Sequence, residues 1–198
     1  MVWDDAPDAG PIGHDEQIEL VGTNLRLKGT VSLGRFGRLT DLINASSGYV
    51  RVRDAQLLQR NGESSGLDLA ELMVDQDEIS FIAQAHAARP EPGSGVGFIE
   101  PVFADTVEAR QAREFVMFTP GHTVTGRVHV FGQTDLAGFV DATDPRFVPV
   151  TGVTTRSLAD RRIVSHYDFI LINRTQLIAA AEAAGRDETG HVEDVAGG

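Results

Sequence analysis

The feature that most constrains the fold is internal similarity: two stretches of the chain follow one pattern of apolar, glycine and turn residues. LRLKGTVSL (25–33) aligns with HTVTGRVHV (122–130), which matches Gly29 with Gly126. The later blocks are LTDLINAS (39–46) with LAGFVDAT (136–143), YVRV (49–52) with FVPV (147–150), and LMVDQDEI (72–79) with ILINRTQL (170–177). Four blocks in the same order, each separated by 97 or 98 residues, predict a duplicated unit.

Each copy has the sequence pattern of β-strands. QIELVGTNLRLKGTVSL alternates apolar and polar residues around GTN, and EFVMFTPGHTVTGRVHVF does so around TPGH, as expected of hairpins with one buried face. GYVRVRDAQLL puts Val50 and Val52 on one face of a strand. LTDLIN suffices for one helical turn. We therefore expect a mainly β protein made of two tandem small β-barrel or curled-sheet repeats.

Changes in composition predict the domain boundaries. We expect an acidic N-terminal arm over 1–16, a first β repeat over 17–85, a linker over 86–113, a second β repeat over 114–184 and a disordered tail over 185–198. The linker contains the Pro- and Gly-rich segment AHAARPEPGSGVGFIEP. It ends in DTVEARQAR (105–113), whose good helix formers make it a candidate short helix.

Charge and composition argue against several classes of function. A formal net charge of −12 disfavours general binding to nucleic acid or to an anionic membrane. The absence of cysteine excludes a disulfide, a thiolate nucleophile and a Cys-ligated metal. No apolar run approaches the roughly 20 residues of a membrane-spanning helix, and the first residues carry acids rather than the basic start of a secretory signal. We expect a cytoplasmic protein without a membrane partner.

Basic residues gather in the first copy, where 21–60 hold seven basic residues and two acidic ones. The tip GRFGR could clamp a phosphate between Arg35 and Arg38 while Phe36 stacks on a ring. Arg51 and Arg53 alternate to the polar face of their strand and extend this candidate ligand-binding set. The alternative interpretation is a solvated hairpin tip with Phe36 folded onto the core. The second copy has FGQTD here and lacks both tip arginines.

Other polar residues fit structural roles. Asp41 or the preceding Thr40 is expected to cap the helical turn, and Asn44 to end it in a left-handed conformation. Asn173 and Arg174 follow an apolar strand, where a turn is the favoured interpretation.

Sequence motifs for catalysis or metal binding are missing. The histidines have no H-x-x-x-H or H-E-x-x-H spacing, there is no G-x-S-x-G elbow, and GSGVG (93–97) lies in the linker rather than between a strand and a helix. We expect no metal, no cofactor and no catalytic residues.

The turn RLTDLIN (38–44), the strand YVRVRDAQLL (49–58) and the closing FILINRTQLI (169–178) resemble a bacterial small-β domain family of unknown function. That family has a Gly-centred hairpin, an Arg-Leu-Ser/Thr-Asp-x-hydrophobic-Asn turn, a strand ending in Asp-Ala and a final strand closing on Asn-Arg. The first copy matches the turn and Asp54-Ala55, and the second matches the close at Asn173-Arg174. The resemblance implies no activity. A looser likeness is to Sm-like and SH3-like barrels, although Asp41 and Asn44 are one residue too close for the Sm motif.

Three functions follow as hypotheses. Duplication without a catalytic motif favours a non-catalytic binding or assembly module whose partner is a second copy of itself or another protein, because small β domains leave exposed edges. The second hypothesis is a binder of an anion, nucleotide or RNA through the arginine-rich face. The third, ranked last, is an enzyme with a site between the repeats.

Overall fold

The structure, a computed structural model, describes residues 14–84, 111–130, 135–142 and 144–183. We call 14–84 the first half and the described residues from 111 to 183 the second half. In the first half the elements are β1 (Asp15–Gly22), β2 (Arg26–Ser32), α1 (Leu39–Ala45), β3 (Tyr49–Leu58), β4 (Ser64–Asp75), the 3-10 turn η1 (Gln76–Glu78) and β5 (Ile79–Gln84). In the second half they are β6 (Gln111–Phe118), β7 (His122–Val130), α2 (Leu136–Asp141), β8 (Phe147–Ser157), β9 (Val164–Asn173), η2 (Arg174–Gln176) and β10 (Ala179–Glu182).

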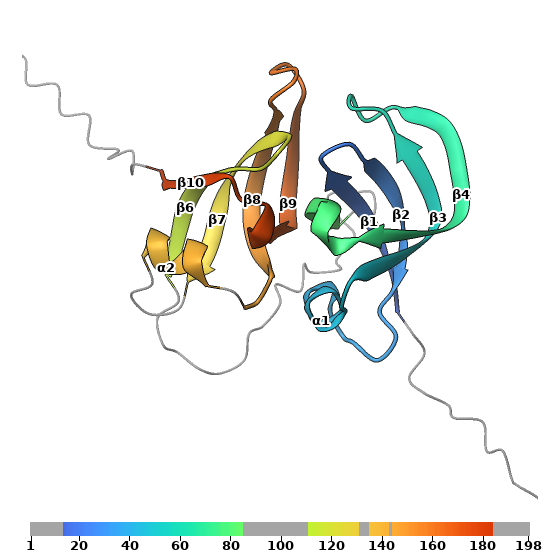
Figure 1. Ribbon diagram of the computed structural model, residues 1–198, viewed down its shortest axis with the longest axis horizontal. Coiled ribbons are helices and arrows are strands. Elements are labelled where there is room, and N and C mark those ends of the chain that lie inside the picture. The colour runs from blue at the N-terminus through green and yellow to red at the C-terminus, as the bar shows by residue number, and fades with distance from the viewer. Residues whose placement is uncertain (1–13, 85–110, 131–134, 143, 184–198) are drawn as a thin grey trace, which may run out of the picture.

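Ten strands form one open antiparallel sheet in the order β10-β6-β7-β8-β9-β5-β1-β2-β3-β4. The mainly β class expected from the sequence is therefore confirmed. Figure 1 shows the two halves side by side, with β10 on one outer margin and β4 on the other. Where the sequence predicted two small barrels or curled sheets, the structure has a single sheet, because β5 of the first half pairs with β9 of the second.

Both halves have the same order of strands. The first half runs β5-β1-β2-β3-β4 and the second runs β10-β6-β7-β8-β9. The registers also correspond, since Ile18 lies opposite Gly29 in the first hairpin and Phe115 lies opposite Gly126 in the second. Each strand of one half therefore has a counterpart in the other half.

A matching bulge bends both halves. The ladder shifts register beside Gly29, between β2 and β3, and beside Gly126, between β7 and β8. The opposite strand turns through a positive φ at Asp54 (48°) in the first half and at Gly152 (59°) in the second. A Cβ on Gly29 would lie 2.5 Å from Val52 Cγ1, so only glycine permits this close approach.

The short helices correct the predicted caps. The N-cap of α1 is Arg38, which makes no side-chain cap bond, so neither Thr40 nor Asp41 caps the helix. The helix runs through Asn44 to Ala45, and its C-cap is Ser46 in an extended conformation, so Asn44 does not end it. In α2 the side chain of Asp135 does act as the cap and accepts a hydrogen bond from Gly138 N at 2.8 Å.

Alternation along the strands builds two apolar cores. Val50 and Val52 of β3 are buried, as the sequence predicts, and Leu20 and Leu27 join them in the first core. The second core is centred on Phe115 and Phe139, whose rings stack with centroids 5.1 Å apart.

The predicted linker helix is partly wrong. Gln111–Arg113, the end of DTVEARQAR, belong to strand β6 instead. The remainder of that segment, the glycine-rich GSGVG and the predicted tail lie outside the described residues. Over the ranges that the structure describes, no helix is both long and apolar enough to cross a bilayer.

Candidate interaction site: the junction and the two free edges

The arginine-rich tip lies between β2 and α1. Gly34 has a positive φ of 55°, and Phe36 N donates a hydrogen bond to Leu33 O at 2.9 Å. Phe36 is half-buried, and the guanidinium of Arg35 lies over its ring at 5.2 Å from the centroid. Arg38 is exposed at the start of α1.

The two strand arginines of the candidate set are paired with acids. Arg51 forms an ion pair with Glu71 of the neighbouring strand, and Arg53 forms one with Asp15 of β1 at 2.7 Å. The hydrogen bond from Arg53 lowers the pKa of the Asp15 carboxyl, as does a bond from Ser32. The structure therefore does not gather these arginines into an unpaired basic face. A ligand-binding role for Arg35, Phe36, Arg38, Arg51 and Arg53 stays a prediction.

The most specific polar and apolar contacts lie instead at the junction, where the two halves meet at β5 and β9. Three backbone pairs join these strands, with Ile82 opposite Leu171 at the centre. The cores interdigitate across this line. Phe147 and Leu171 of the second half pack in the core of the first, while Val21, Phe81 and Ala83 of the first half pack in the core of the second. Each half therefore completes the other's core.

An asparagine clamps the halves together beside this ladder. Asn44 Nδ2 donates to Phe147 O at 2.9 Å, and Phe147 N donates to Asn44 Oδ1 at 2.8 Å. The amide therefore binds the backbone of β8 in both directions, as a neighbouring strand would. This contact, absent from any sequence pattern, explains why Asn44 lies within α1 rather than at its end.

A second asparagine crosses the junction from the end of β9. Asn173 is fully buried, and its Nδ2 donates to Gln76 O at 3.0 Å and to Ile79 O at 2.8 Å. Its Oδ1 accepts from Thr175 N at 3.1 Å and so caps η2. An ion pair between Arg146 and Asp77 adds a charged contact nearby.

The neighbouring Arg174 has a structural role. Its side chain is buried, and its guanidinium donates to Phe139 O of α2 at 3.2 Å and to Pro145 O in the segment before β8. Burial lowers the pKa of Arg174, and the nearby Asp144 partly opposes that shift. Gln76 has the same role in the first half, where its Nε2 donates to Ile43 O at 3.1 Å. The structure thus agrees with the turn interpretation of Asn173 and Arg174 and adds the contacts across the junction.

The outer edges, β4 and β10, present the counterparts of these junction residues without a partner strand among the described residues. The paired registers match Tyr49 with Phe147 and Met73 with Leu171. Phe147 and Leu171 are fully buried, whereas Tyr49 is 55% and Met73 is 51% exposed.

The opposite edge has the same character. Phe118 corresponds to Val21, and Ala179 and Ala181 of β10 correspond to Phe81 and Ala83 of β5. Phe118 is 36% exposed, and both alanines are exposed. Both outer edges therefore carry exposed apolar residues at positions whose counterparts are buried at the junction.

Two polar counterparts differ from their junction residues. Asp75 takes the place of Asn173, and it likewise accepts a hydrogen bond from the backbone N–H two residues ahead, at 2.9 Å. A carboxylate has no N–H to donate, so Asp75 cannot reproduce the bonds that Asn173 makes across the junction. In the helix, Asp141 is the sequence match of Asn44 and has the same limitation.

Sequence reasoning missed the junction residues because each one acts on a residue far away in the chain. One signal was present, since Tyr49 and Met73 align with the apolar Phe147 and Leu171, although Met73 lies on the edge strand β4 and Tyr49 on its neighbour β3. Among the residues with described positions, no group of three metal-ligating side chains gathers in one place.

No protein-family model, curated protein or solved structure matches the chain. Its function must therefore be inferred from the junction and the two free edges themselves.

Proposed function

We propose that this chain is a non-catalytic assembly module whose copies join head to tail, with β4 of one copy pairing with β10 of the next. The observation that carries the proposal is the pairing of β5 with β9. β4 is the counterpart of β9, and β10 is the counterpart of β5, so each outer edge is one side of the same joint.

The matched halves support a duplicated unit as the origin of this arrangement. Strand order, the register of the first hairpin and the bulge beside Gly29 and Gly126 agree between the halves. Duplication fuses two copies of a unit that joins its neighbour edge to edge. A fused pair still has one free edge of each kind, and we propose that these edges bind other copies of the chain.

Transferring the junction register to the outer edges defines the proposed contact. The junction pairs Phe81 with Ile172 and Ile82 with Leu171. The equivalent contact between copies pairs Ala179 with Val74 and Ala180 with Met73. The alanines are smaller than the residues they replace, so less apolar surface is buried and we expect reversible, concentration-dependent association. Because the joint is head to tail, repeated pairing yields a closed ring or an open filament.

The alternative functions have less support. An anion or RNA site on the arginine-rich face is disfavoured by the ion pairs of Arg51 and Arg53. An enzyme site along the β5–β9 ladder is disfavoured because apolar residues from both halves fill the space beside it.

Disulfide trapping tests the register directly, because the natural chain has no cysteine. We expect the double variant Met73→Cys with Ala180→Cys to form disulfide-linked dimers and larger species under mild oxidation. Directly opposite residues in an antiparallel pair have Cα atoms about 4.5–5.5 Å apart, which a disulfide spans. Non-reducing electrophoresis and light scattering of the natural chain over a range of concentrations provide the measurements.

The matched control is Leu67→Cys with Ala180→Cys. Leu67 also lies on β4 and is 48% exposed, but it is out of register with the proposed contact. Equal cross-linking of the two double variants would contradict the proposal. So would a strict monomer at a protein concentration of several hundred micromolar, which is on the order of the dissociation constant of a weak interface.

A further inference from the structure

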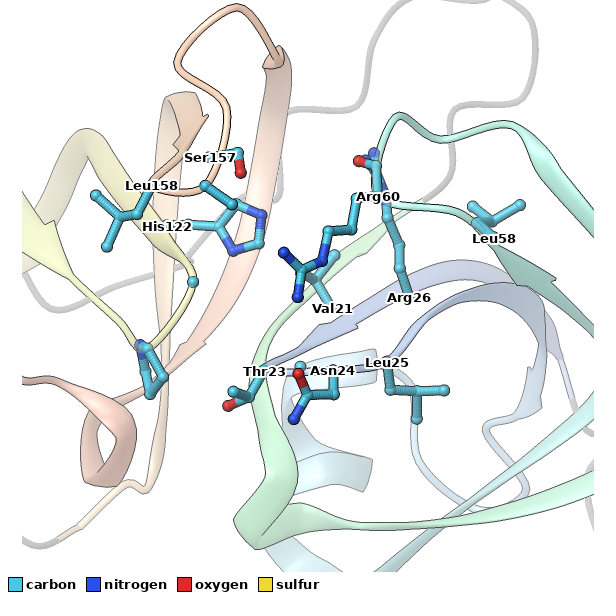
Figure 2. Close-up of a pocket in the computed structure, with 14 residues that line it drawn as sticks. Val21, Thr23, Asn24, Leu25, Arg26, Leu58, Arg60, His122, Ser157 and Leu158 are labelled. Atoms are coloured by element: carbon cyan, nitrogen blue, oxygen red, sulfur yellow. The ribbon is translucent and has the colours of Figure 1, made fainter.

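Four hairpin turns, two from each half, enclose a pocket of about 190 Å³ at one end of the junction. From the first half come the β1–β2 turn, with Thr23 and Asn24, and Arg60 of the β3–β4 turn. From the second half come the β6–β7 turn, with His122, and the β8–β9 turn, with Ser157. Figure 2 shows His122 on one wall and Arg26 and Arg60 on the opposite wall.

The first wall arginine is already neutralised. Arg26 Nη2 lies 2.6 Å from Glu19 Oε1, and both side chains are largely buried. The Tyr167 hydroxyl donates to the same carboxylate oxygen at 3.3 Å. Arg26 Nη1 also donates to Arg60 O at 3.0 Å, which ties the β3–β4 turn to the pocket wall. The role of Arg26 is therefore to hold the turn that carries Arg60.

The second wall arginine has an unused charge. No hydrogen bond or ion pair engages the Arg60 guanidinium within the described part of the chain. Glu19 offsets only one of the two guanidinium charges, so the pocket has a net positive charge when His122 is neutral. An otherwise acidic protein therefore keeps one unpaired cation where all four turns converge.

His122 supplies an unused polar atom beside this charge. Its Nδ1 is buried and has no hydrogen-bond partner in the described structure. Phe81 holds the ring in an edge-to-face contact, with centroids 5.6 Å apart. Buried polar atoms in folded proteins are nearly always satisfied, so the imidazole of His122 retains unused hydrogen-bonding capacity beside the pocket.

We propose that this pocket binds a single phosphate group, held by the Arg60 guanidinium and the His122 imidazole. Arginine binds phosphate oxygens through charge-assisted hydrogen bonds, and a monohydrogen phosphate offers both a donor and acceptors to the imidazole. The pocket is smaller than the roughly 300–1,000 Å³ of sites for drug-sized ligands, so only the phosphate group enters it.

The site is independent of the proposed assembly. Its residues come from the four turns and from the strand ends beside them, at the end of the internal junction, and none belongs to β4 or β10. A protein that binds phosphate as a monomer would support this inference alone, and one that assembles without binding phosphate would support only the assembly.

The test uses inorganic phosphate and NMR of the histidine side chains in the full chain. Burial, followed by the charges of Arg26 and Arg60, lowers the pKa of His122. A bound dianion offsets those charges, so we expect phosphate to raise the pKa of His122 and to shift its ring resonances with saturation. Arg60→Gln should weaken binding about tenfold or more, the effect of one lost charge-assisted hydrogen bond.

Arg127→Gln is the matched control, because Arg127 is exposed on β7, does not line the pocket and carries the same charge. We expect its phosphate affinity to equal that of the natural chain. Three results would overturn the inference: His122 resonances unmoved by about 10 mM phosphate, within the millimolar range of weak single-group ligands; equal losses in the two variants; or the same shifts with chloride at matched ionic strength.

Discussion

The junction and the free edges are built from corresponding strands. The junction strands β5 and β9 are paired with each other, whereas the edge strands β4 and β10 each have one unpaired side among the described residues. At the junction, Phe147 and Leu171 are fully buried and two asparagines bind backbone groups across it. On the edge strand β4 and its neighbour β3, Met73 and Tyr49 take the corresponding strand positions and remain half-exposed. The junction and the outer edges both have apolar residues at these positions. The amide donors Asn173 and Asn44, however, have Asp75 and Asp141 as their counterparts.

This difference separates two requirements of a strand interface. Apolar side chains make any contact favourable in proportion to the area that it buries. Amides that donate to specific carbonyls favour one register of strand pairing. Any other register would leave those buried carbonyl oxygens without a donor. The internal joint has both properties, whereas the outer edges have only the first, which suits reversible association between chains.

The largest expected effect on stability distinguishes Leu171 at the junction from Met73, its counterpart on β4. Leu171→Ala should lower the free energy of unfolding by about 2–5 kcal/mol, because it leaves a cavity in the first core. Met73→Ala should change the stability of the monomer by only about 0.5 kcal/mol, because half of the side chain is already in water. Chemical denaturation at low protein concentration measures both values.

The same two variants should rank the other way in their effect on the association of chains, with Met73→Ala having the larger effect. Met73→Ala should weaken the association of folded chains, as sedimentation or light scattering would detect. If Met73→Ala left association unchanged, the edge would not use the position that the junction uses.

The second effect concerns the amide that crosses the junction. Asn173→Asp retains the acceptor that caps η2 but puts a carboxylate against Gln76 O and Ile79 O. We expect a loss of about 3 kcal/mol, since two donated bonds disappear and a charge faces two carbonyl oxygens. Thermal and chemical unfolding measure it.

The control for Asn173→Asp is Asn24→Asp, the same change at an exposed residue of the β1–β2 turn whose side chain makes no hydrogen bond within the described part of the chain. It should shift stability by no more than about 0.5 kcal/mol. Similar losses at both sites would mean that the charge change, rather than the contact across the junction, causes the effect.

The third effect makes an outer edge resemble the junction. Asp75→Asn supplies the Nδ2 donor of Asn173 while keeping the cap on η1. We expect the association of chains to tighten about tenfold, equivalent to one net hydrogen bond. Asp68→Asn, at an exposed position of the same strand, changes the charge equally and should have little effect on association.

The smallest effect lies at the pocket end of the junction. Because burial and then Arg26 and Arg60 hold the pKa of His122 below its ordinary value of 6.5, the folded chain releases this proton more readily than the unfolded chain. The resulting stability is complete above pH 6.5 and is lost as the pH falls through the folded pKa.

His122→Gln should therefore flatten the pH dependence of the free energy of unfolding in this window, measured in phosphate-free buffer. An unchanged slope in the variant would show that His122 titrates alike in both states.

Much of the fold could be predicted from short-range pattern. The alternation of Val50 and Val52 with polar neighbours specifies a strand face, and the matched Gly29 and Gly126 mark the close approach in each half. Helix caps were less predictable, because Asn44 is used by Phe147 of the other half and α1 begins at a cap without a side-chain bond.

The candidate site was less predictable than the fold. The arginines drew attention because charge is visible in a sequence, yet Asp15 and Glu71, distant along the chain, pair with Arg53 and Arg51. His122 and Arg60 have no common motif and meet only where turns from both halves converge.

The sequence by itself determined the β class and the corresponding blocks in the two halves, because side-chain alternation and glycine at a close crossing act over a few residues. Only the tertiary structure decided that β5 pairs with β9, that Asn44 and Asn173 hold this joint, and that β4 and β10 remain open. The physical reason is that backbone hydrogen bonding between strands is nearly independent of sequence. The choice of partner strand therefore depends on which apolar faces can be buried together.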